Sequence, residues 1–198
     1  MAIHTIGDSH STPQHGGWSG VINHHLGAKL CYSFGRDVLE LCDIRQYGMQ
    51  DDDTIIFSLG EIDCRCHVHK HINETTTYQQ IIDNIVVKYF EAIKINIALS
   101  GITFKHICVY NIIPPANKHN SRENPKQPFL GSNEERKNYV LYFNAKLKEL
   151  CKINNYMFFD IYDKYTDTNG FLSKDLSDGH VHIKDGRYIL EFVKDNLL

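Results

Sequence analysis

The sequence predicts an α/β fold, a three-layer α/β/α sandwich built on a five-stranded parallel sheet. Short apolar runs rich in Ile, Val, Tyr and Phe recur along the 198-residue chain and are typical of buried strands. Longer stretches with apolar residues at helical spacing lie between them. Strands that alternate with helices form parallel sheets covered on both faces, because their crossover connections are right-handed. The length and the 42% of apolar residues suit one domain spanning 1–198.

Five runs are predicted to be strands, namely 2–6, 29–34, 54–59, 106–111 and 156–160. Four helices are predicted between and after them, over 37–46, 76–99, 132–150 and 185–196. The third of these helices opens with Ser132-Asn133-Glu134-Glu135, the pattern of a capping box.

Small and polar residues follow four of the predicted strands. In open parallel sheets the binding site lies at the carboxyl ends of the strands, so these segments are expected to meet at one edge. The segments are 7–11 (GDSHS), 35–37 (GRD), 60–65 (GEIDCR) and 111–115 (NIIPP), and a further polar segment, 178–182 (DGHVH), lies near the C-terminus.

These segments resemble the sequence blocks of the SGNH/GDSL hydrolases, in the order that the family has them. Gly7-Asp8-Ser9 resembles the nucleophile block, Gly35 the oxyanion glycine, and 60–63 the third block. The segment 178–182 resembles the last block, usually Asp-x-x-His. The resemblance implies a flavodoxin-like SGNH-hydrolase fold, with the blocks covering nearly the whole chain.

The resemblance implies a catalytic triad in which Ser9 is the nucleophile. A serine hydroxyl needs a base to take its proton, and a carboxylate to orient that base. We expect His182 to be the base, with His180 as the alternative, because histidines stand two and four residues after Asp178 rather than three. Asp178 is the expected acid, and Asp175 is a second candidate. The backbone amides of Ser9 and Gly35 are the expected oxyanion donors.

The third block departs from the family pattern. Ile62 stands where the family usually has an Asn that donates to the oxyanion, and Arg65 or Arg36 could substitute for it. Glu61, Asp63 and Arg65 could instead form a structural ion-pair network. The residues expected to contact substrate are Asp8, His10, Arg36, Glu61, Asp63, Arg65 and His67.

Composition argues against several other functions. The net charge of −3 and the absence of a basic stripe argue against nucleic-acid binding and against an anionic membrane surface. The N-terminal residues do not resemble a signal peptide, so we expect a cytoplasmic protein whose six cysteines are reduced. Residues 64–71 hold Cys and His, but without zinc-finger spacing, so no metal and no other cofactor is expected.

The sequence therefore predicts a serine esterase that removes a small acyl group, acetyl above all, from a carbohydrate through an acyl-Ser9 intermediate. Two alternatives remain. One is an acyltransferase that uses the same intermediate, and the other is a non-catalytic carbohydrate-binding module that keeps the fold. The proline-containing segment 114–131 is either a substrate loop or a plain surface loop. The sequence does not indicate an oligomeric state.

Overall fold

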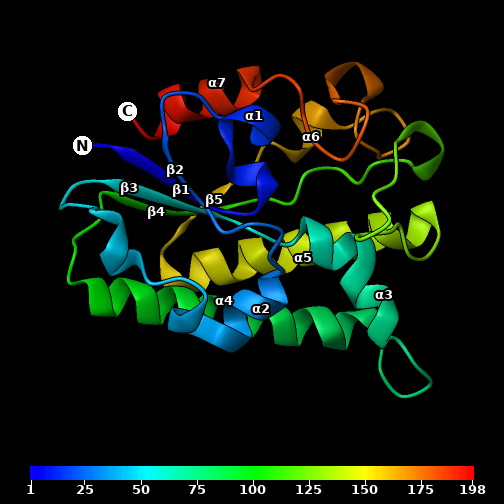
Figure 1. Cartoon of the computed structure of the whole chain (residues 1–198), viewed down its shortest axis with the longest axis horizontal. Coiled ribbons are helices and arrows are strands. Elements are labelled where there is room, and N and C mark those ends of the chain that lie inside the picture. Colours follow the sequence, from blue (N-terminus) through cyan, green and yellow to red (C-terminus); the bar gives the residue numbers. More distant parts are fainter.

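The computed structural model describes all 198 residues and contains one parallel sheet of five strands in the order β2-β1-β3-β4-β5 (Figure 1). The predicted α/β fold with a five-stranded parallel sheet is confirmed. The strands are β1 (Ile3–Gly7), β2 (Ile22–His25), β3 (Thr54–Ser58), β4 (His106–Tyr110) and β5 (Met157–Phe159).

Helices cover both faces of the sheet and complete the three layers. The helices are α1 (Pro13–Gly16), α2 (Cys31–Asp37), α3 (Val68–His71), α4 (Tyr78–Ser100), α5 (Asn133–Asn154), α6 (Tyr162–Tyr165) and α7 (Arg187–Asn196). Figure 1 shows α2, α4 and α5 on one side of the sheet and α1 and α7 on the other. A π-helical segment, Asp63–His67, precedes α3.

Side chains of β3 alternate between two apolar cores, as they must when a strand is buried on both faces. Ile55 and Phe57 belong to a 25-residue cluster with α4 and α5, whereas Ile56 belongs to a 13-residue cluster with α7. Trp18 is buried in the second cluster against Tyr110. The sheet is therefore held between two cores of unequal size.

The long helices begin where their capping residues predict. Ser132 caps α5 in a capping box with Glu135, and Thr77 caps α4 in the same way with Gln80. The predicted helices 76–99, 132–150 and 185–196 are confirmed with small shifts at their ends. All six cysteines are free and buried. None of the helices combines the length and the apolar character that crossing a membrane requires.

The prediction of a strand over 29–34 is wrong, because this segment starts α2. The N-cap residue Leu30 offers no capping side chain. The buried Asp63 carboxylate, which follows β3, accepts hydrogen bonds from the backbone amides of Cys31 and Tyr32 at 2.6 and 3.1 Å. A tertiary contact thus caps a helix whose own residues resemble a strand.

The second strand is instead β2, which lies at the edge of the sheet. Its four residues, INHH, are half-buried or exposed, so it carries little of the apolar pattern that marks the other strands. The predicted helix 37–46 is also wrong, since α2 ends at Asp37 and two 3-10 turns follow, Val38–Glu40 and Ile44–Tyr47.

Replacement of Asp63 by alanine should lower the free energy of unfolding by about 2 kcal/mol, because two buried amides at the start of α2 lose their acceptor. Chemical denaturation followed by circular dichroism measures the change. Asp195→Ala, at an exposed position of α7, is the matched control and should stay within about 0.5 kcal/mol of the original protein. Equal stability of the two variants would contradict the capping role of Asp63.

Candidate active site

Ser9 lies on the sharp turn that follows β1, at the carboxyl edge of the sheet. It begins the 3-10 turn Ser9–Ser11, in which the Asp8 carboxylate accepts a hydrogen bond from the His10 amide at 2.9 Å. Gly7 makes this turn possible, because a Cβ at Gly7 would lie 1.9 Å from the Ser58 carbonyl oxygen of β3. Since Ser9 is the first residue of the turn, its amide has no partner within the turn.

The structure brings Ser9, His182 and Asp178 together. The Ser9 Oγ lies 2.9 Å from His182 Nε2, and His182 Nδ1 lies 3.0 Å from Asp178 Oδ2. His180, the alternative base, is half-buried and has its Nδ1 3.2 Å from the Arg122 carbonyl oxygen. Asp175, the alternative acid, lies apart in the turn Lys174–Leu176.

A tight turn absorbs the extra residue between Asp178 and His182. The Asp178 amide donates to the His182 carbonyl at 3.0 Å, and Asp178 Oδ1 accepts from the amides of His180 and His182 at 2.8 and 3.2 Å. Gly179 adopts a φ of 84°, which other residues rarely reach. The Asp178 carboxylate therefore organises its own turn and also contacts the His182 ring.

His182 and Asp178, the two ionisable residues in the series that begins at Ser9, both have shifted pKa values. Burial and the neighbouring His10 lower the pKa of His182 to about 4, although Asp178 opposes this shift. Partial burial acts to raise the pKa of Asp178, but hydrogen bonds from the His180 amide and the His182 ring outweigh it, so this pKa is lowered. At neutral pH His182 is therefore a neutral imidazole able to accept a proton, and Asp178 is ionised.

Ser9 and His182 open into a cavity of about 430 Å³ with polar walls. Only one of its ten lining residues, Val181, is hydrophobic. Arg65 and Arg122 contribute guanidinium groups, and the loop that holds Asn124 and Gln127 forms one wall. A cavity of this size and polarity suits a compact polar ligand rather than a long acyl chain.

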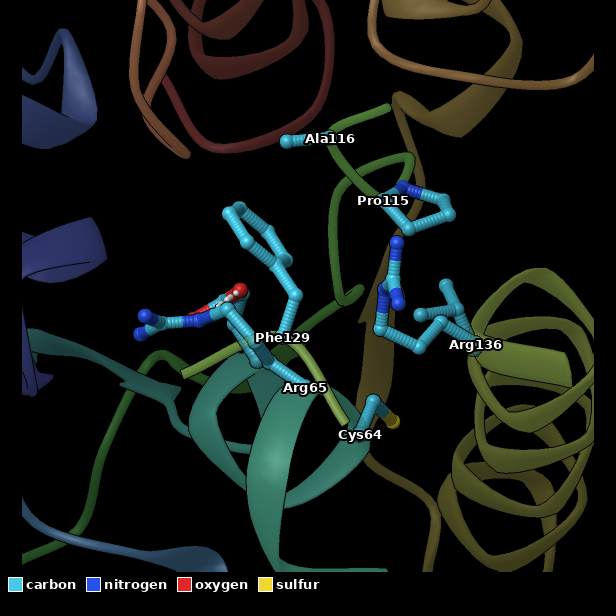
Figure 2. A pocket seen from close by; sticks show the side chains of 8 residues that line it. Cys64, Arg65, Pro115, Ala116, Phe129 and Arg136 are labelled. Carbon is cyan, nitrogen blue, oxygen red and sulfur yellow. Dashed lines mark hydrogen bonds and ion pairs between the residues drawn. The ribbon is translucent and has the colours of Figure 1, made fainter. Parts of the chain in front are cut away.

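The loop 114–131 is tied to the body of the protein. The Arg65 guanidinium binds Glu61 at 2.8 Å and donates to the Gln127 carbonyl at 2.7 Å. Figure 2 shows Phe129 between the side chains of Arg65 and Arg136, whose guanidinium carbons lie 5.9 and 5.0 Å from the ring centre. Arg136 also donates to the Gly131 carbonyl at 2.7 Å. These contacts therefore fix the loop that forms one wall of the cavity.

Several residues predicted to contact substrate lie inside the protein instead. Asp8 is fully buried and pairs with His10, whose ring is also buried. The Glu61 carboxylate is buried against Arg65, and Asp63 caps α2. Of the proposed network of Glu61, Asp63 and Arg65, the structure forms only the Glu61–Arg65 pair. The predicted substrate contacts of Asp8, His10, Glu61 and Asp63 are therefore wrong, whereas Arg65 does line the cavity.

The predictions for Gly35, Arg36 and His67 are also wrong. Gly35 lies within α2 against α4, where an added Cβ would be 2.8 Å from the Lys88 Cβ, so it supplies close helix packing rather than an oxyanion donor. Arg36 is exposed and paired with Asp37. The His67 ring packs between Tyr32 and His71, outside the cavity. The errors for Gly35 and Arg36 follow from misplacing the second strand.

Two residues near Ser9 were missed by sequence reasoning. Gly27 stands two residues after the end of β2, with a φ of 80°, and β2 pairs with β1 so that His25 lies beside Gly7. Gly27 is thus the glycine that follows the second strand. Its signal was present in the sequence, but β2 was not recognised. His15, from α1, has its ring 4.9 Å from that of His182.

One group of side chains has the chemistry of a metal site. His15, Asp178 and His182 have ligand atoms within 4.8 Å of one another, but two of these residues already form the hydrogen bonds to Ser9 and within the turn. The histidines of 67–71 lie on helical segments and do not converge: the rings of His67 and His71 are 4.4 Å apart, whereas His69 Nδ1 lies 3.1 Å from the Tyr139 hydroxyl.

Solved structures match nearly the whole chain. A GDSL-like lipase from Bacteroides thetaiotaomicron is 13% identical with a TM-score of 0.61, over 96% of this chain and 83% of that one. Phospholipase A1 from Streptomyces albidoflavus is 11% identical with a TM-score of 0.59, over 98% and 99%. A catalytic mutant of an acetylxylan esterase from Geobacillus stearothermophilus is 12% identical with a TM-score of 0.59, over 98% and 92%.

The likeness lies in the structure rather than in the sequence. No protein-family model matches the chain, and no curated protein matches it in sequence. At these identities the matches show the fold: the chain has the three-layer fold of the SGNH/GDSL hydrolases, as the resemblance of its blocks implied.

Replacement of Arg65 by methionine should lower the free energy of unfolding by about 3 kcal/mol, because it leaves the Glu61 carboxylate buried without its partner. Thermal and chemical denaturation measure the loss. The double variant Glu61→Gln/Arg65→Met should regain part of it, because no unpaired charge then remains. Additive losses in the double variant would show that the two side chains are not energetically coupled.

Proposed function

We propose that this chain, which has the fold of the SGNH/GDSL hydrolases, is a serine ester hydrolase with Ser9 as its nucleophile. The observation that carries the proposal is the unbroken series of hydrogen bonds from Ser9 through His182 to Asp178, beside an open polar cavity. A non-catalytic module would not need a neutral histidine held against a serine hydroxyl, so this geometry argues against that alternative.

The proposed reaction proceeds in two halves. His182 Nε2 takes the proton from Ser9 Oγ while Oγ bonds to the ester carbonyl carbon, and the same nitrogen then gives that proton to the departing alcohol oxygen. Water next attacks the acyl-Ser9 ester, with His182 taking its proton and returning it to Oγ. Asp178 holds the His182 ring with Nδ1–H towards itself and stabilises the ring while it is charged.

Backbone amides are the proposed oxyanion donors. The amides of Ser9 and Gly27 follow neighbouring strands, and both strands end at the same edge of the sheet. Ile62 supplies no donor, and the hydrogen bonds of Arg65 to Glu61 and Gln127 hold its guanidinium in the cavity wall. The hole therefore depends on amides that the fold itself orients, which requires no reorganisation as charge develops.

The substrate proposed is a small acyl ester, acetyl above all, of a polar alcohol such as a carbohydrate. The support is the cavity, whose lining residues are nearly all polar, with Asn124, Gln127 and Arg122 able to offer hydrogen bonds. An acyltransferase would use the same acyl-Ser9 and a sugar hydroxyl in place of water. Product analysis with an added sugar acceptor separates transfer from hydrolysis.

Ser9→Ala and His182→Ala should each reduce kcat for p-nitrophenyl acetate by about 10⁴-fold or more, since removal of a triad member leaves only binding and the oxyanion donors. His180→Ala should keep activity within about threefold, because the His180 ring contacts the Arg122 carbonyl and not Ser9. Purified variants with matched circular dichroism spectra provide the comparison.

Two outcomes would contradict these assignments. Loss of activity in His180→Ala, with His182→Ala still active, would move the base to His180. If the original protein and Ser9→Ala turn over this ester and acetylated sugars equally fast, that result would contradict the proposal of a hydrolase.

The pH dependence of kcat/KM should extend further into acid than for an ordinary histidine base. His182 has a pKa of about 4, so it remains neutral, and able to accept a proton, as the pH falls from 7 to about 5. Activity should decline only as the pH approaches that value. Rates measured by chromatography of the released product avoid the ionisation of a chromophore. An inflection near the ordinary histidine value of about 6.5 would contradict the expectation.

A further inference from the structure

A second histidine, His10, lies buried between β1 and the turn that carries His182. Its Nδ1 lies 3.0 Å from Asp8 Oδ1, and its Nε2 lies 3.2 Å from the Val181 carbonyl oxygen. A carbonyl oxygen and an ionised carboxylate only accept hydrogen bonds. A neutral imidazole has one N–H and could serve only one of them, whereas an imidazolium donates to both.

The surroundings favour the ionised pair. Asp8 is fully buried, its Oδ1 also accepts the His10 amide at 2.9 Å, and its Oδ2 has no partner, so the carboxylate needs a cation beside it. Burial works against a charged His10, but the charge of Asp8 outweighs it and raises the pKa of His10 to about 9. Glu61 adds to this effect and is itself paired with Arg65.

The contact from His10 reaches the residue next to the proposed base. The Val181 carbonyl belongs to the peptide that joins Val181 to His182, so this hydrogen bond holds the backbone of His182 on one side while Asp178 holds its ring on the other. Trp18 Nε1 donates to the His10 carbonyl at 2.9 Å and anchors His10 in turn. The rings of His10 and His182 are 4.8 Å apart.

We propose that the buried Asp8–His10 ion pair is a positioning device for His182: it holds the 181–182 peptide in place and keeps a fixed positive charge beside the His182 ring. This inference rests on the proposed function, since it concerns the base of that reaction. His10 is a positioning residue, because it is buried and does not line the cavity that would hold the ester.

Three ionisable groups adjoin His182, namely Asp178, His10 and His15, and the charge of Glu61 also favours a protonated His182. Asp178 favours a charged His182, whereas His10 disfavours it, and His15 is an exposed ring on α1. Loss of the His10 charge should therefore make His182 easier to protonate. A residue that merely fills the core would leave the titration of His182 unchanged.

The test compares His10→Gln with the matched control His71→Gln, which changes an exposed histidine at the end of α3, outside the lining of the cavity. Glutamine can still donate to the Val181 carbonyl but carries no charge. The probe is an alkyl fluorophosphonate, whose phosphorus bonds to Ser9 Oγ as fluoride leaves and His182 takes the serine proton. The labelling rate of Ser9, measured by intact mass, is followed from pH 3.5 to 9 for both variants and the original protein.

We expect the acid inflection of labelling to rise by about one to two pH units in His10→Gln, because a like charge beside His182 is removed. The rate at neutral pH should fall about ten- to hundredfold, since small misplacements of a reacting group have effects of this size. KM for p-nitrophenyl acetate should stay within about twofold, and His71→Gln should match the original protein. An unchanged inflection and an unchanged rate in His10→Gln would overturn the proposal.

Histidine nitrogen NMR of the unmodified protein gives a second readout that needs neither a variant nor activity. The proposal requires both His10 nitrogens to carry protons at pH 7 and His182 to be neutral there. A neutral His10 at pH 7 would overturn it, even if His10→Gln does not fold. Absence of Ser9 labelling at every pH in the original protein would contradict the proposed function, and NMR alone would then decide whether His10 is the charged partner of Asp8.

Discussion

Pairing of β1 between β2 and β3 is the constraint on which the rest of the structure depends. Gly7, the last residue of β1, lies beside His25 of β2 and Ser58 of β3, so the segments that follow all three strands emerge at one edge of the sheet. The close approach to the Ser58 carbonyl leaves no room for a side chain at Gly7. Ser9 is therefore presented on a turn whose position the sheet determines, with the segment that follows β2 on one side and the segment that follows β3 on the other.

Buried charges then hold the segments around that turn. Three buried acids make three different contacts. Asp63 caps α2, Glu61 binds Arg65 and through it the loop at Gln127, and Asp8 binds His10. Because each buried carboxylate is paired with a cation or with backbone amides, the desolvation that burial imposes is offset by contacts to another element. Most of the residues predicted to contact substrate therefore lie inside the protein and stabilise the segments around the cavity.

The proposed base lies between opposing charges. Asp178 stabilises a protonated His182, while a charged His10 on the other side destabilises it, and burial adds to the second effect. This arrangement keeps His182 neutral and ready to accept a proton over a wide pH range. The same arrangement gives a weaker base, so the reaction depends on the direct hydrogen bond from Ser9 Oγ and on oriented amides to lower the barrier.

The sequence by itself determined the fold class and the segments that carry the proposed catalytic residues, because both are encoded locally. Strand and helix periodicity marked four of the five strands, a capping box marked α5, and 7–11 with 178–182 carried Ser9, Asp178 and His182. Only the tertiary structure decided between His180 and His182, because the choice depends on how the turn at Gly179 folds back onto β1. It also decided that 31–37 is a helix and INHH a strand, since Asp63 caps the first and sheet pairing forms the second. Contacts between residues far apart in the chain override local preference there, so the glycine that follows the second strand is Gly27 rather than Gly35.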